Sequence, residues 1–194
     1  MFARNEKVVY PGHGVAVINC VIEKKIAGRS LQFFELRFLN KDMTILVPTN
    51  NATEVGIRPL SSTEYINEIF KLLAQPIITK QLDSAISNWN KRNKEYQGKL
   101  RSGNLLELCA IYRDLRHIEN NKELSFGEKS LLQQTENLLS EEISIVTKIN
   151  VNDAAKQLKD LVKCKKNNEP SSSFVQNTAF VESTSKTKIK NLTR

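Results

Sequence analysis

The first sixty residues carry short apolar runs separated by turn residues, and apolar and polar side chains alternate within several of these runs. The longest run, 15–22, is rich in β-branched residues, and a later run ends at Pro48, which cannot donate a hydrogen bond to a neighbouring strand. Turn sequences such as Pro11-Gly12-His13-Gly14 lie between the runs. The pattern predicts five short strands within residues 7–60, arranged as a small antiparallel β-barrel.

From residue 61 onward the apolar residues recur every three or four positions, which is the period of an amphipathic helix. Three helix starts carry a capping residue followed three positions later by glutamate: Ser61 with Glu64, Asn104 with Glu107, and Ser125 with Glu128. These helices predict a compact antiparallel bundle over residues 61–149. The fold class predicted is therefore α+β, with a β-barrel domain at residues 1–60 followed by an all-α domain.

The helical pattern weakens after Asn150. Residues 154–162 could form one or two more helical turns, and the remainder is rich in Ser, Thr, Asn and Lys with few apolar anchors. Such a composition cannot bury enough apolar surface to order the chain, so residues 150–194 are predicted to be a basic, disordered tail.

The placement of charge favours an anionic partner for the second part of the chain. The net charge is +8, and residues 80–194 carry twenty cations against fourteen acids, whereas residues 1–79 carry nine against seven. Nucleic acid, an anionic membrane or an acidic protein would each fit this excess. The chain lacks an apolar run of membrane-spanning length and a signal-peptide pattern near Met1, so a cytoplasmic protein is expected.

The sequence offers little for catalysis or metal binding. The three cysteines are far apart, and His13 and His117 stand alone in different parts of the chain. There is no HExxH motif, nucleophile elbow or phosphate loop. We therefore expect no enzymatic activity, no metal, no cofactor, and a monomer.

The only tryptophan, Trp89, begins the most distinctive stretch. Basic residues follow it closely: Lys91, Arg92, Lys94, Lys99 and Arg101. Trp89 shares a helical spacing with Leu82, Ile86, Tyr96 and Leu100, which favours a place in the core. A helix beginning after Ser87 and Asn88 would instead put the ring on a first turn, where it could reach a nucleic acid. The local pattern leaves both interpretations open.

Two groups of motifs resemble the CarD/CdnL family of bacterial transcription regulators. The first is the opening segment Val8–Val15, which reads VVYPGHGV. The second group begins with Trp89, Lys91 and Arg92. It continues with the segments 100–103, 113–115 and 124–129, the last without Phe126. The resemblance covers about residues 4–148.

The resemblance implies a Tudor-like N-terminal domain that docks on the RNA polymerase β subunit, and a helical domain that binds promoter DNA just upstream of the melted bubble. Lys24 matches a basic position that contacts the β subunit. Leu46 departs from the arginine that some relatives carry at this interface, so Arg37 or Lys41 would make that contact. These are the residues expected to bind polymerase.

In the helical domain the resemblance implies that Trp89 wedges into the minor groove at the upstream edge of the bubble. Lys91 and Lys94 match positions that contact the DNA backbone, and Arg92 lies beside them. Lys99 and Arg101 complete the expected DNA-binding set. The expected function is a regulator that stabilises the open complex with little sequence specificity; the alternative is a general nucleic-acid-binding protein without polymerase contact.

Overall fold

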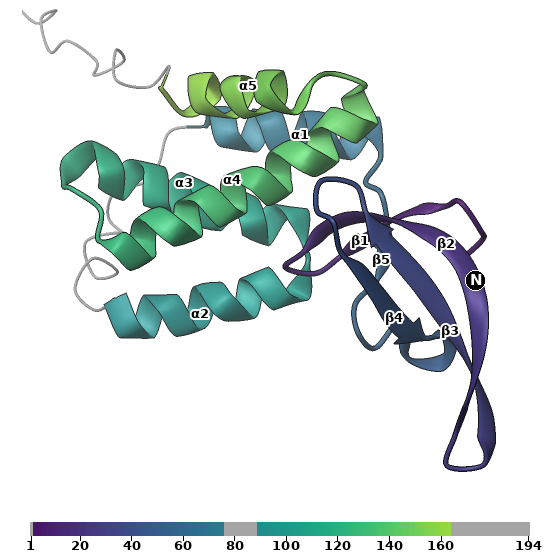
Figure 1. Ribbon diagram of the computed structural model, residues 1–194. Helices are drawn as coiled ribbons and strands as arrows, with labels where there is room; N and C mark the ends of the chain where they lie inside the picture. Colours follow the sequence, from purple (N-terminus) through teal and green to yellow (C-terminus); the bar gives the residue numbers. More distant parts are fainter. Residues whose placement is uncertain (1, 76–88, 164–194) are drawn as a thin grey trace, which may run out of the picture.

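The computed structural model describes residues 2–75 and 89–163, which form an antiparallel sheet and a set of helices packed side by side (Figure 1). The sheet comprises β1 (Lys7–Tyr10), β2 (Gly14–Ile26), β3 (Arg29–Phe38), β4 (Thr44–Pro48) and β5 (Arg58–Pro59). A short 3-10 helix, η1 (Thr49–Asn51), follows β4. The helices are α1 (Thr63–Ala74), α2 (Trp89–Ser102), α3 (Leu105–Asn121), α4 (Phe126–Thr147) and α5 (Val151–Lys163).

The sheet has the strand order β4-β3-β2-β1-β5 and every neighbouring pair is antiparallel. Its inner face buries alternate residues of β3, Phe34, Leu36 and Phe38, against Val8 and Ile18. This confirms the α+β class and the five strands. The order leaves β4 and β5 as edges, so the sheet is not fully closed, but it is consistent with the small antiparallel barrel that the strand pattern predicted.

Two predicted helix starts are confirmed and one shifts by a residue. Ser125 and Glu128 form a complete capping box at the start of α4, and the Asn104 side chain accepts a hydrogen bond at the start of α3. At α1 the cap is Ser62, whose side chain accepts the Tyr65 backbone N–H. Ser61 does not cap α1, because its hydroxyl and backbone N–H both donate to Glu142.

Helix α5 corrects the predicted boundary of the tail. It packs on α4 and α1, and its Ala154, Leu158 and Val162 lie in the same core as α1, α3 and α4. These three positions are four residues apart, so they form one apolar stripe that the polar surroundings concealed in the sequence. The helical unit therefore extends to Lys163, and the rest of the predicted tail, residues 164–194, lies outside the described residues.

A polar cluster joins the sheet to the helices. The Glu142 carboxylate of α4 receives two hydrogen bonds of 2.7 Å from the Arg58 guanidinium of β5. The Nε of Arg58 donates to the Gly103 carbonyl between α2 and α3, at 2.9 Å. Because Arg58 of the sheet bonds both to Glu142 and to the Gly103 carbonyl, the end of α2 has a fixed position relative to the sheet. No helix in the described ranges is long and apolar enough to cross a membrane.

Candidate nucleic-acid interface

The helix α2 divides its cations between an outer and an inner face. Lys91, Lys94 and Arg101 are spaced three and seven residues apart, which places them on one side of the helix, and all three are exposed. The opposite side buries Tyr96 and Leu100. No ion pair is formed by these three cations within the described ranges. The outer face of α2 therefore presents a row of free positive charge.

Lys99 is on the flank of this row. Its Nζ lies 3.0 Å from the Glu95 carboxylate, one turn earlier, and its side chain is 29% exposed. The pair is partly solvated and contributes little to stability. A phosphate could displace Glu95, so Lys99 stays a candidate contact, although a weaker one than the three cations of the outer face.

Arg92 takes an internal position instead of the predicted contact with phosphate. The residue is only 6% exposed, and its Nη2 donates to Oε1 of Glu128 at 2.8 Å. Its Cζ lies 5.8 Å from the centroid of the Trp89 ring. We therefore remove Arg92 from the DNA surface, because a phosphate could reach this guanidinium only if the pair with Glu128 broke.

The Glu128 carboxylate that holds Arg92 is itself fixed by the start of α4. It accepts the Ser125 backbone N–H at 2.9 Å in addition to the Arg92 donor. Burial on its own would raise the pKa of Glu128, but hydrogen bonds from Ser125 and Arg92 outweigh burial and lower that pKa below the usual range. Glu128 is therefore ionised near neutral pH and links α2 to α4.

Trp89 is neither a core residue nor a free side chain. Its ring is half-buried and rests on the bundle core. The ring also lies against Gly127: a Cβ at that glycine would lie 3.0 Å from Cζ2 of Trp89. Gly127 thus provides the space for the ring, which is neither fully buried nor fully exposed. Ser87 and Asn88, which were expected to start this helix, lie outside the described residues.

The candidate polymerase contacts fall in two places. Lys24 is opposite Leu31, and Arg37 lies six residues after Leu31 along β3. Lys24 and Arg37 therefore point to the same outer face of the sheet, roughly 20 Å apart. Leu46, opposite Glu35, lies between them on the same face. Lys41 is elsewhere: its Nζ donates to the His13 carbonyl at 2.7 Å, beside α4.

An apolar strip separates Lys24 from Arg37. Ile22, Phe33 and Pro48 lie side by side across β2, β3 and β4, and Leu46 is in the next row on the same face. The sequence reasoning did not find this strip because it depends on the bulge at Asn19, which shifts the register of β2 against β3. The outer face thus combines apolar area with a cation at each end.

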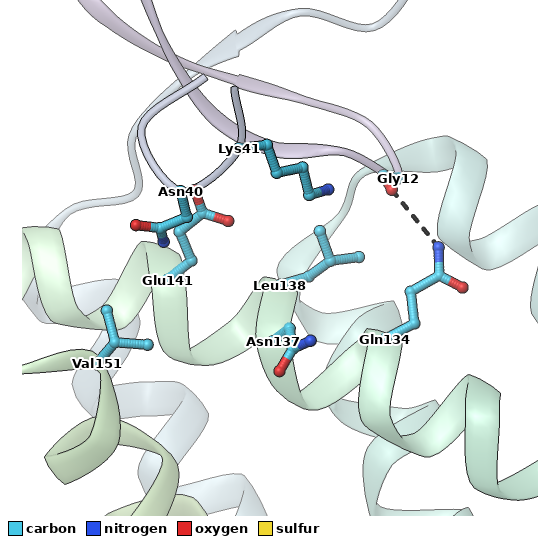
Figure 2. Close-up of a pocket in the computed structure, with 8 residues that line it drawn as sticks. All are labelled: Gly12, Asn40, Lys41, Gln134, Asn137, Leu138, Glu141 and Val151. Carbon is cyan, nitrogen blue, oxygen red and sulfur yellow. Dashed lines mark hydrogen bonds between the residues drawn. The ribbon is translucent and has the colours of Figure 1, made fainter. Parts of the chain in front are cut away.

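Lys41 lines a cleft between the sheet and α4 instead of the outer face. Figure 2 shows this cleft, which has a volume of about 340 Å³. Its lining residues are Gly12, Asn40, Lys41, Gln134, Asn137, Leu138, Glu141 and Val151. Burial raises the pKa of Glu141, which packs directly under Gly14. No cluster of His, Cys, Asp or Glu side chains in the described ranges could hold a metal ion.

Comparison with known proteins gives a consistent result for both units. The family model described as "CarD-like/TRCF RID domain" matches residues 2–61, and the one described as "CarD, C-terminal domain" matches residues 68–159. The matched ranges cover the sheet and reach into α5, so they also support the extended boundary of the helical unit.

The chain is also similar to two individual proteins. A protein of Bacillus subtilis (strain 168) named "Putative transcription factor YdeB" is 26% identical over 146 residues, which are 75% of this chain and 92% of that protein. The solution NMR structure of the 72-residue N-terminal domain of Myxococcus xanthus CarD is 29% identical, with a TM-score of 0.27, covering 30% of this chain and 79% of that domain.

Proposed function

The chain belongs to the CarD family of transcription regulators, and from this premise we propose that it binds the RNA polymerase β subunit through its sheet and promoter DNA through its helices. In this proposal the helical unit lies at the upstream edge of the transcription bubble and stabilises the open complex. The observation that carries the DNA contact is the row of free cations on α2, the helix whose first turn also carries the half-buried ring of Trp89.

The row and the ring have separate tasks in this mechanism. Lys91, Lys94 and Arg101 neutralise phosphates of the duplex, which gives affinity without base specificity. The Trp89 ring, which packs against the bundle core with the Arg92 guanidinium 5.8 Å from its centroid, enters the step where the strands separate. Unstacking a base step costs a few kcal/mol, and the phosphate contacts beside it offset that cost.

The sheet supplies the proposed polymerase contact. Its outer face offers the partly exposed apolar residues Ile22, Leu46 and Pro48 around the buried Phe33, with Lys24 at one end and Arg37 at the other. An apolar centre with a charged rim is the usual composition of a protein interface. Lys41 is not included, because it faces α4.

Two measurements test the proposal. Trp89→Ala should shorten the lifetime of open promoter complexes about five- to hundredfold, because an inserted aromatic contributes roughly 1–3 kcal/mol. The double variant Lys91→Ala with Lys94→Ala should instead weaken duplex binding and reduce its salt dependence. If Trp89→Ala folds normally and its open complexes last as long as those of the parent, the wedge mechanism fails.

Two neighbouring lysines on β2 provide a matched pair of variants that tests the polymerase contact. Lys24 and its neighbour Lys25 are both exposed but point to opposite faces of the hairpin, as their partners Leu31 and Ser30 do. Lys24→Glu should weaken capture of the isolated β subunit by the full chain in the absence of DNA, and Lys25→Glu should not. Equal capture by the parent and both variants would mean that β is bound away from this face, and no capture by the parent would favour a general nucleic-acid-binding protein without polymerase contact.

A further inference from the structure

Phe126 is the most exposed large apolar side chain in the described ranges. It is 89% exposed, and the next is Val21 at 50%. Phe126 is the first residue of α4, directly after the Ser125 cap.

Within the described ranges, Phe126 contributes nothing to the core. The buried residues of α4 begin at Glu128 and continue through Leu131 and Leu132, and the helical period places Phe126 away from that stripe. Leu124, two residues earlier, is buried and anchors the entry into the helix. Replacing Phe126 with a smaller residue would therefore not remove a core contact.

The position of Phe126 connects it to Trp89. The next residue, Gly127, is the one on which the Trp89 indole rests, with only 3.0 Å between Cζ2 and a Cβ built there. The beginnings of α2 and α4 lie at the same end of the helical unit, remote from the sheet (Figure 1). Two aromatic side chains thus occupy one end of the bundle, one half-buried and one projecting.

Cations lie on the first turns of both helices. Lys129 follows Phe126 by three residues, on the same side of α4, and Lys91 lies on the first turn of α2, on the exposed side of that helix. Lys129 is paired with Glu123 at 2.8 Å, but both side chains are largely exposed, so a phosphate can replace that partner. An exposed ring beside cations is the arrangement that single-stranded nucleic acid requires, because the ring meets a base and the cations meet the backbone.

We propose that Phe126 is a second base-stacking side chain, which takes an unpaired DNA base next to the junction that Trp89 occupies. This inference rests on the proposed function, because it assumes that DNA reaches this end of the bundle. Trp89 then meets the last stacked step, and Phe126 meets the first base released from it. The ligand is single-stranded DNA continuous with duplex, with no requirement for a particular base.

The test compares a forked DNA with the corresponding full duplex, using the full chain. The fork carries 2-aminopurine at its first unpaired positions, so that stacking is read as fluorescence quenching and affinity as a titration. Phe126→Ala should lower affinity for the fork about fivefold or more, abolish the quenching, and change duplex affinity by less than about twofold. Phe126→Tyr should keep both, whereas Phe126→Leu should lose the quenching.

The test has a matched control, and its outcomes distinguish failure of this inference from failure of the proposed function. Leu106→Ala removes another exposed apolar side chain, on α3, and should change neither reading. If Phe126→Ala binds the fork like the parent while Trp89→Ala loses preference for it, this inference is wrong and the proposed function stands. If neither substitution nor the Lys91 and Lys94 pair affects DNA binding, the proposed function fails as well.

Other binding partners of the exposed Phe126 ring would give different results. A second copy of the chain would show as concentration-dependent association in sedimentation, lost in Phe126→Ala without any change in fork affinity. A protein surface on polymerase would show as weaker capture of polymerase by Phe126→Ala in the absence of DNA. An equal loss of fork and duplex affinity would mean that the ring does not read an unpaired base. Each of these outcomes overturns the inference.

Discussion

The Glu142 carboxylate is the group that joins the two units most directly, so removing it tests their fixed arrangement. Its side chain is 2% exposed and accepts two bonds of 2.7 Å from Arg58. It accepts two more from Ser61, at 3.0 Å from the backbone N–H and 2.7 Å from the hydroxyl. Glu142→Ala would leave all four donors without this acceptor. Removing one partner of a buried pair costs about 3–5 kcal/mol. Because the Arg58 side chain is 25% exposed and water can reach it, we expect the lower end of that range.

The free energy of unfolding should be measured by urea titration for the parent, Glu142→Ala, Arg58→Ala and the double variant. The coupling energy between the two residues should be roughly 1.5–3 kcal/mol, as for hydrogen bonds to charged groups. Glu123→Ala is the control, because that carboxylate forms an exposed pair with Lys129. We expect it to cost less than about 1 kcal/mol. If Glu142→Ala costs no more than Glu123→Ala, this pair does not hold the units together and the argument is refuted.

Three further predictions follow from the packing of the helices. Truncation after Asn150 removes α5 with its buried Leu158 and Val162, and should lower stability by about 3 kcal/mol or more in chemical denaturation, whereas truncation after Lys163 should leave it unchanged. Gly127→Ala should displace the Trp89 ring, which would appear as a red shift of its fluorescence and a shorter lifetime of open complexes; an unchanged spectrum would contradict the contact. Burial raises the pKa of Glu141, so the folded state binds this proton more tightly than the unfolded state and stability falls as pH rises between the ordinary glutamate pKa and the raised one. Glu141→Gln should flatten that fall in thermal midpoints measured from about pH 4 to about pH 8, and a parallel curve would show that Glu141 does not titrate abnormally.

Much of the secondary structure can be read from the sequence because its signals are local. The β-branched run at 15–22 lies within β2, and the capping box of Ser125 and Glu128 starts α4 as predicted. The one helix assigned to the tail, α5, has a short apolar stripe in a polar segment. Such a helix is stable only because α1 and α4 cover its stripe, and a local pattern does not contain that information.

The candidate site divides in the same way. The sequence by itself determined that one tryptophan is followed by a dense group of cations, and it located that group on a single helix. Only the tertiary structure decided which cations are free: Lys91, Lys94 and Arg101 point to solvent, whereas Arg92 is turned inward by Glu128, thirty-six residues away in the chain. Helical spacing gives the direction of a side chain relative to its own helix. Its partner on another helix depends on how the helices pack, and the packing depends on the whole core at once.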